Sequence, residues 1–325
     1  EALCDPPLKH EDLVIHVSFS RNGSRLLSCS ADSVVKIWDW QQQPPRLVAT
    51  LLGHTDYVTK ASFSSDGKRV LTASPDGTAR IWDAESGKEL KMIPHVGAVK
   101  WAEWSRDGGK VVTCGDDNAA RIWDAETWKQ IGETMEHEGS VVKAGFSRNG
   151  QRVVTASTDW TARVWDAETG YPLSDPLRHN APLTWVEFSS DEKGSRVVTA
   201  GKDLTARLWD LPPAPEGKVP KWVPRWAAAV VGLRLDGNTP VALGWEERNA
   251  IRQEVLALPV DNYYARIAKW FYDDPAMRPI TPFSSMTLES YVANRLRENT
   301  GASIEEALRV MPSTELSKAM RRLLD

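Results

Sequence analysis

The sequence predicts an all-β propeller followed by an α-helical C-terminal domain. Three observations predict this fold: a five-fold repeat with a period of 41 to 44 residues, short alternating strands inside each repeat, and a change to helical periodicity after the fifth. Four short antiparallel strands at such a period are typical of one propeller blade. The 325 residues are enough for two domains.

The second repeat shows how each one is expected to fold. Alternating and β-branched residues predict three strands and a short outer strand, at 58–63, 69–74, 78–83 and around 89–92. Asp66-Gly67 suits a tight hairpin turn between the first two strands. We expect five recognisable four-stranded blades within residues 1–210, spanning about 8–52, 53–94, 95–136, 137–178 and 179–210.

Each repeat contains the same four residue types in the same order: a histidine, a serine or threonine, an aspartate and a tryptophan followed by aspartate. The five sets are His10, Ser28, Asp32, Trp38; His54, Thr72, Asp76, Trp82; His95, Thr113, Asp117, Trp123; His137, Thr155, Asp159, Trp165; and His179, Thr199, Asp203, Trp209. The histidine precedes the tryptophan by 28 residues in four sets and by 30 in the last. A two-residue insertion at the fifth repeat's first hairpin explains that difference, because it lengthens a turn and leaves the strands intact.

These recurring residues resemble the WD-repeat β-propeller family over residues 1–210. The resemblance implies that the four side chains form a buried hydrogen-bond chain that ties each blade together. Buried polar groups must be hydrogen-bonded, and a satisfied network specifies one packing. His54, Thr72 and Asp76 also have the residue types of a catalytic triad. Five copies, each ending at a covering tryptophan, favour the structural interpretation.

The phrases at 61–67, 153–157 and 161–170 resemble the near-identical repeats of large bacterial multi-repeat WD proteins, some of them fused to Ser/Thr protein kinases. Residues 1–7 parallel the segment that begins at Leu173, so they are expected to form the outer strand of a preceding or closing blade. That strand either closes the ring or belongs to an earlier blade. We favour the second account, in which the chain is a C-terminal fragment of a longer protein.

The repeat stops at Leu211, where a proline-rich linker is expected over residues 211–220. Residues 221–325 are predicted to form a helical domain. Its expected helices lie at about 222–231, 246–258, 263–271, 288–296, from 303 onward, and 315–324.

Composition and motifs exclude several classes of function. The net charge of −4 gives no electrostatic case for nucleic acid, and no apolar run is long enough for a membrane segment. Cys4, Cys29 and Cys114 lack the spacing of a metal site, and no cofactor-binding loop is present, so we expect neither metal nor cofactor. Free buried thiols indicate a reducing compartment, and we therefore expect a cytoplasmic, non-catalytic protein.

The resemblance implies a protein–protein interaction scaffold that presents rim loops to a protein partner. By analogy with the heterotrimeric G-protein β subunit, the partner-facing positions are the third and fifth after each histidine and the one before each repeated aspartate. The candidate rim residues are ten taken from these positions, with Trp160 added: Leu13, Ile15, Tyr57, Thr59, Lys100, Asp116, Val142, Thr158, Trp160, Thr184 and Lys202.

The alternative is an enzyme or small-ligand-binding propeller that uses the central channel or the seam with the helical domain. We expect the first strands to line the axis with small apolar residues, which disfavours chemistry there: Ala61, Ala102, Ala144 and Val186. Trp101 and Trp185 share one repeat position, and we interpret it as packing between blades.

Overall fold

The computed structural model describes residues 8–42, 44–191, 194–211, 222–236, 239–259, 263–273 and 290. The chain divides into two compact units, Glu1–Leu211 and Pro212–Asp325. The expected outer strand at residues 1–7 lies outside the described residues, as does most of the predicted linker.

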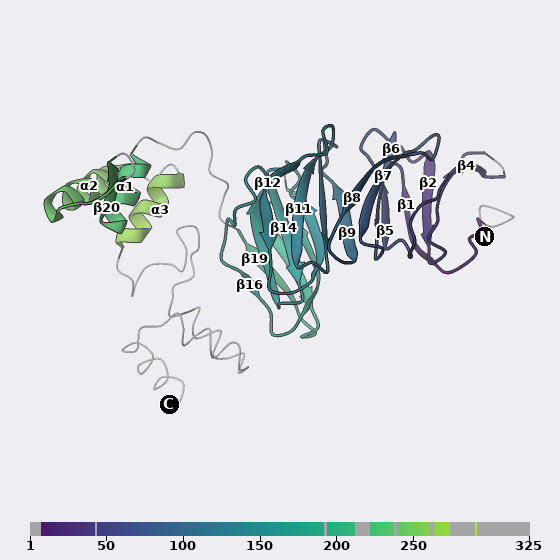
Figure 1. Cartoon of the computed structure of the whole chain (residues 1–325). Coiled ribbons are helices and arrows are strands. Elements are labelled where there is room, and N and C mark those ends of the chain that lie inside the picture. Colours follow the sequence, from purple (N-terminus) through teal and green to yellow (C-terminus); the bar gives the residue numbers. More distant parts are fainter. Residues whose placement is uncertain are drawn as a thin grey trace, which may run out of the picture. The chain divides into compact units, whose positions relative to one another are not determined.

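The first unit contains five consecutive antiparallel sheets, here called blades 1 to 5 (Figure 1). Strands β1–β4 form blade 1, β5–β8 blade 2, β9–β12 blade 3, β13–β16 blade 4 and β17–β19 blade 5. Their bounds are β1 Val14–Phe19, β2 Arg25–Ser30, β3 Val35–Asp39, β4 Arg46–Leu51, β5 Lys60–Phe63, β6 Arg69–Ser74, β7 Thr78–Asp83, β8 Glu89–Pro94, β9 Val99–Trp104, β10 Lys110–Gly115, β11 Ala119–Asp124, β12 Gln130–Glu136, β13 Val141–Phe146, β14 Arg152–Ser157, β15 Thr161–Asp166, β16 Leu177–Arg178, β17 Leu183–Phe188, β18 Arg196–Gly201 and β19 Ala206–Asp210.

Blades 1 to 4 have the four strands that the repeat predicts, in chain order from the first strand to the fourth. Blade 5 has three strands among the described residues. Its third strand, β19, ends at Asp210, and the described residues stop at Leu211, where the proline-rich segment begins. Figure 1 shows the blades side by side in chain order.

The core of the first unit lies between blades. Each blade has a leading face, which packs on the blade before it, and a trailing face, which packs on the blade after it. Leu27 and Ile37 on the trailing face of blade 1 form one buried cluster with Val58, Ala61 and other residues on the leading face of blade 2. Three more clusters join blades 2 to 3, 3 to 4 and 4 to 5 in the same way. Burial of apolar area at these four interfaces is the main stabilising term.

A register irregularity near the start of the first strand sets which side chains face the neighbouring blade. In blade 4 the pairing between β13 and β14 shifts between Val141 and Lys143. Corresponding shifts occur in blades 1 and 5. The extra residue changes the phase of the alternation. Val141 and Ala144, three positions apart, therefore lie in the same buried cluster between blades.

The second unit, in its described part, has helices α1 (Val223–Val231), α2 (Trp245–Ala257) and α3 (Tyr263–Tyr272). These agree with the three helices predicted up to residue 271. A two-stranded hairpin, β20 (Leu233–Asp236) with β21 (Thr239–Ala242), separates α1 from α2. This hairpin is not among the elements predicted from the sequence, although Asp236-Gly237 is a hairpin turn signal. The helices predicted beyond residue 288 lie outside the described residues, apart from residue 290.

The helices pack through a small apolar core. Ala229 of α1, Ile251 and Val255 of α2 and Ala268 of α3 form it, with Trp226 packed against them. None of the helices in the described ranges combines the length and apolar character that crossing a membrane requires.

Candidate functional site

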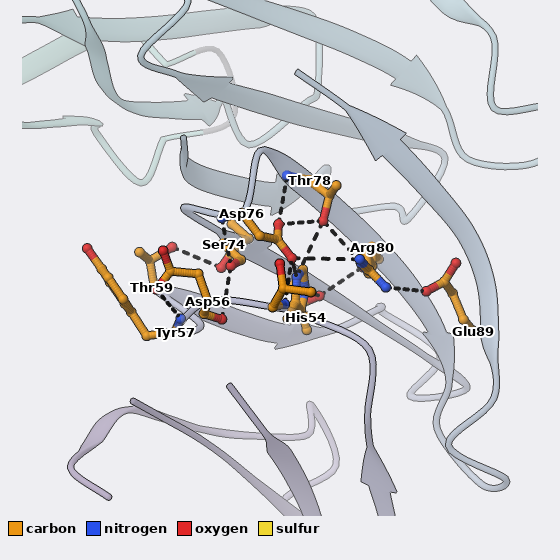
Figure 2. Close-up of polar contacts among 12 residues, drawn as sticks. His54, Asp56, Tyr57, Thr59, Ser74, Asp76, Thr78, Arg80 and Glu89 are labelled. Atoms are coloured by element: carbon orange, nitrogen blue, oxygen red, sulfur yellow. Dashed lines mark hydrogen bonds and ion pairs between the residues drawn. The ribbon is translucent and has the colours of Figure 1, made fainter. Parts of the chain in front are cut away.

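The four repeated side chains of blade 2 form one continuous hydrogen-bond chain. The Trp82 indole N–H donates to the hydroxyl of Thr72 at 2.9 Å, and that hydroxyl lies 2.7 Å from Nε2 of His54. Nδ1 of His54 lies 2.7 Å from a carboxylate oxygen of Asp76. Figure 2 shows His54 and Asp76 in contact, with Thr78 and Arg80 beside the carboxylate.

Which group donates in each hydrogen bond of this chain follows from which of its atoms carry a proton. Because the indole can only donate, the Thr72 hydroxyl accepts from Trp82 and its own proton is free to go to Nε2 of His54. A neutral His54 then carries its proton on Nδ1 and donates it to Asp76. Thr72 is fully buried, and Trp82 already occupies one of its lone pairs. The chain therefore resembles a triad in residue types but offers no exposed nucleophile.

The other four blades repeat this geometry. The histidine Nδ1 to aspartate distances are 3.1, 3.1, 2.8 and 2.9 Å in blades 1, 3, 4 and 5. The histidine Nε2 to hydroxyl distances are 2.7, 2.9, 2.7 and 2.7 Å. The indole N–H donates to the same hydroxyl at 3.0, 2.8, 2.8 and 2.8 Å. A constellation found in every blade stabilises the blades and cannot mark one site.

Burial and hydrogen bonding change the pKa values of these groups. Burial lowers the pKa of His54, His95 and His179, and the partner aspartates only partly oppose this. For Asp76 burial alone would raise the pKa, but hydrogen bonds from Thr78 and His54 outweigh it and hold the pKa below its ordinary value. The folded state therefore favours a neutral imidazole beside an ionised carboxylate.

These shifts predict that acid destabilises the first unit. An unfolded histidine takes up a proton near pH 6.5, whereas the buried histidines with a lowered pKa do so only at lower pH. Between those values the unfolded chain binds more protons, so the free energy of unfolding falls as the pH falls. The carboxylates add a further loss below about pH 4. Denaturant titrations from about pH 8 to about pH 5 should show this decline; a constant or rising free energy would contradict it.

The loop after each repeated aspartate has an unusual backbone. The next residue has a positive φ in every blade: Ser33, Gly77, Asn118, Trp160 and Leu204. Glycine and asparagine adopt this left-handed conformation readily, whereas a bulky side chain there costs about 1 kcal/mol or more. Trp160 is 46% exposed and Leu204 97% exposed, so core packing does not compensate.

The predicted rim residues differ in how available they are. Leu13 and Ile15 of blade 1 and Tyr57 of blade 2 are exposed apolar side chains, as expected of a contact patch. In Figure 2 the Tyr57 ring points away from the His54–Asp76 network. Asp116, Thr158, Thr184 and Lys202 are also exposed, whereas Thr59, Lys100 and Val142 are half-buried.

Several polar rim candidates already form ion pairs or hydrogen bonds with other residues of the protein. Lys100 forms an ion pair of 2.9 Å with Asp116, whose carboxylate also accepts from Ser140. Thr59 donates to the carbonyl of Ala73. Val142 packs against the cluster between blades 4 and 5. The exposed candidates are thus both apolar, as Leu13, Ile15, Tyr57 and Trp160 are, and polar, as Thr158 and Lys202 are. Sequence analysis missed Leu204, although it occupies the repeat position of Trp160.

The expectation of a small, apolar axis is wrong. Ala61, Ala102, Ala144 and Val186 are buried in the apolar clusters between blades. Side chains from the first strands of blades that are not neighbours come together instead. The rings of Trp101 in blade 3 and Trp185 in blade 5 lie 5.5 Å apart although blade 4 separates their sheets.

Lysines and carboxylates complete this cluster. The Lys60 ammonium lies 3.4 Å from the centre of the Trp101 ring, and the Lys143 ammonium lies 3.3 Å from that of Trp185. Each lysine is 3.9 Å from a carboxylate, of Glu103 for Lys60 and of Glu187 for Lys143. Burial lowers the pKa of Lys143 to about 8 despite these carboxylates. The cations are thus held by cation–π contacts inside the protein.

One cavity, of about 270 Å³, lies between blades 3, 4 and 5. Lys143 and Arg106 line it together with Glu103 and Glu187. The wall thus carries both cations and carboxylates, and the Lys143 ammonium lies 3.9 Å from the Glu187 carboxylate. Within the described ranges no group of three or more histidine, cysteine, aspartate or glutamate side chains could hold a metal ion.

Comparison with known families agrees with the geometry of the blades. The family described as WD domain, G-beta repeat matches residues 8–39, 45–83, 87–124 and 128–166. These four matches fall on blades 1 to 4. Blade 5 has the same hydrogen-bond chain, through His179 and Trp209, outside the matched segments. A search of curated proteins found no match to the chain.

Proposed function

We propose that the first unit of this protein, which carries WD40 repeats, is a non-catalytic scaffold whose rim binds a protein partner. WD40 repeats generally mediate protein–protein interactions. One observation carries the proposal: Trp160 is an exposed indole held at a φ of +73°. A strained backbone with no packing benefit is the kind of feature that selection for a contact retains.

The contact patch of this proposal consists of Leu13, Ile15, Tyr57, Trp160 and Leu204. All five are exposed, and they lie in loops or strand starts next to the repeated histidines or aspartates. Aromatic and large apolar side chains dominate the energy of protein interfaces. The hydrogen-bond chains behind these loops stiffen the blades, which lowers the ordering cost of binding.

The setting that we propose is a bacterial signalling protein in the cytoplasm. The near-identical repeat phrases at 61–67, 153–157 and 161–170 support the bacterial origin. Burial raises the pKa of the Cys29 thiol to about 12, and Cys29 and Cys114 are both free and buried. Unpaired thiols of this kind suit a reducing compartment.

The rim proposal predicts a loss of binding without a loss of stability. In a variant with Leu13, Ile15 and Tyr57 changed to alanine and Trp160 to glycine, we expect partner retention to fall at least tenfold. The glycine removes backbone strain, so the melting temperature should stay the same or rise. Affinity capture from the source cells, followed by direct titration of each retained protein, measures the first effect. Thermal melting measures the second.

A matched control separates the rim from general surface chemistry. Leu90 and Met92 on strand β8 and Tyr171 after β15 are exposed apolar residues away from the rim. Changing these three to alanine should leave partner retention intact. Equal retention by the rim variant and the wild-type chain would overturn the proposal.

A further inference from the structure

Lys143 on strand β13 of blade 4 is a buried lysine. The residue is 5% exposed, and its ammonium lies 3.3 Å from the centre of the Trp185 ring and 5.1 Å from that of the Trp101 ring. Its ion pair with Glu187 is 3.9 Å long, which exceeds the length of a hydrogen bond. Lysines are almost never fully buried unless a charged partner compensates them. Lys143 is thus a buried amine whose positive charge is only partly compensated.

This burial favours the neutral form of the amine. It lowers the pKa of Lys143 to about 8, and the charge of Lys60 adds to the shift, while Glu103 and Glu187 oppose it. At pH 7.5 a pKa of about 8 leaves about a quarter of the amines neutral, against roughly one in a thousand for an exposed lysine. The neutral amine is the form that attacks a carbonyl carbon.

The cavity between blades 3, 4 and 5 gives a small molecule access to this residue. Lys143 lines the cavity, and so do the carboxylates of Glu103 and Glu187 near its ammonium. Gly145 lines it as well, and a Cβ at this position would lie 3.3 Å from a carboxylate oxygen of Glu103. Because a water molecule takes up about 30 Å³, a cavity of about 270 Å³ holds a molecule of about nine non-hydrogen atoms or fewer.

Two arginines line the same cavity and differ in their contacts. Arg148 donates to the carbonyl of Ser190 at 2.9 Å. The guanidinium of Arg106 is exposed and forms no ion pair or hydrogen bond with the residues that the structure describes. A guanidinium binds a carboxylate through two parallel hydrogen bonds. A ligand that carries one carbonyl group and one carboxylate therefore has a partner for each group on this wall.

We propose that Lys143 captures a small oxo acid by reversible imine formation, with the carboxylate of the oxo acid bound to Arg106. The nitrogen of Lys143 attacks the carbonyl carbon, and the carbonyl oxygen leaves as water. Of the three protons of the ammonium form, two leave with that oxygen and one stays on the iminium nitrogen, so the positive charge is conserved. The Trp185 ring and the Glu187 carboxylate then stabilise the iminium as they stabilise the ammonium.

Reductive trapping on the 325-residue chain tests this proposal. With glyoxylate and sodium cyanoborohydride at pH 7.5, hydride reduces the iminium, and each lysine that has reacted gains a carboxymethyl group. Peptide mass spectrometry should show Lys143 modified at least about fivefold faster than three exposed lysines, since its larger neutral fraction outweighs its restricted access. The exposed lysines for this comparison are Lys68, Lys88 and Lys91.

The role of Arg106 is tested with a second aldehyde. Arg106→Ala should slow the modification of Lys143 by glyoxylate at least about threefold. It should leave modification by acetaldehyde unchanged, because acetaldehyde has no carboxylate. Arg21→Ala is the matched control, since Arg21 is exposed and holds the repeat position of Arg106 in blade 1. This control should react like the wild type with both aldehydes.

A last variant and a stability measurement complete the experiment. Lys143→Arg keeps a cation beside Trp185 but has no amine, so the preferred modification should disappear while the melting temperature stays near that of the wild type. Modification of Lys143 no faster than that of the exposed lysines would overturn the proposal. Equal reaction of glyoxylate with Arg106→Ala and the wild type would overturn it as well. The rim residues are unchanged in all these variants, so the outcome is independent of partner binding at the rim.

Discussion

Replacing Trp165 with alanine is expected to lower the free energy of unfolding by about 3–5 kcal/mol. The indole is 4% exposed and lies in the cluster between blades 3 and 4 with Val112, Met135 and Ala144. Its removal leaves a cavity at an interface, and it also takes away the donor to the Thr155 hydroxyl. Denaturant titration followed by far-ultraviolet circular dichroism measures the change.

Trp160 provides the control for this variant, since it lies in the same blade but is 46% exposed. Trp160→Ala should change the free energy of unfolding by no more than about 0.5 kcal/mol. If the two variants were equally stable, the tryptophan of the repeat would not be a core residue.

Asp76→Ala is expected to cost at least about 2 kcal/mol, through hydrogen bonds left unmade. The carboxylate accepts from His54 Nδ1, from the backbone N–H groups of Thr55 and Thr78, and from the Thr78 hydroxyl. It is 2% exposed, so water replaces none of these bonds easily. The same titration measures the loss.

Two further variants sharpen this second experiment. Asp76→Asn keeps one acceptor oxygen for Thr78 but places an amide against His54, so its stability should fall between that of the wild type and the alanine variant. Asp175→Ala, at an exposed position, should behave like the wild type. A wild-type free energy of unfolding for Asp76→Ala would show that the aspartate is dispensable for folding.

The blades could be predicted from the sequence because the same pattern of strand and turn residues occurs five times. Residues 69–74 and 78–83 are predicted as strands, and the structure has β6 and β7 at those bounds. The spacing of His54, Thr72, Asp76 and Trp82 likewise identifies side chains that the structure brings into contact.

Other features depend on geometry that the pattern does not contain. Simple alternation along 141–146 places Ala144 on the opposite face from Val141, whereas the register irregularity puts both in one cluster. The strain at Trp160 and Leu204 is a backbone property, and it becomes visible only when φ is known. For the rim residues themselves, partner contact stays a prediction.

The placement of the core between blades has a consequence for how the first unit loses its structure. Blades 2, 3 and 4 each share an apolar cluster with two neighbours, whereas blades 1 and 5 share one. In such a quasi-one-dimensional array, stability is a sum of nearest-neighbour terms. In the 325-residue chain, amide hydrogens of blades 2 to 4 are therefore expected to exchange more slowly than those of blades 1 and 5. Of the apolar rim residues, Tyr57 and Trp160 then stand on blades that share two apolar clusters, whereas Leu13, Ile15 and Leu204 stand on blades that share one.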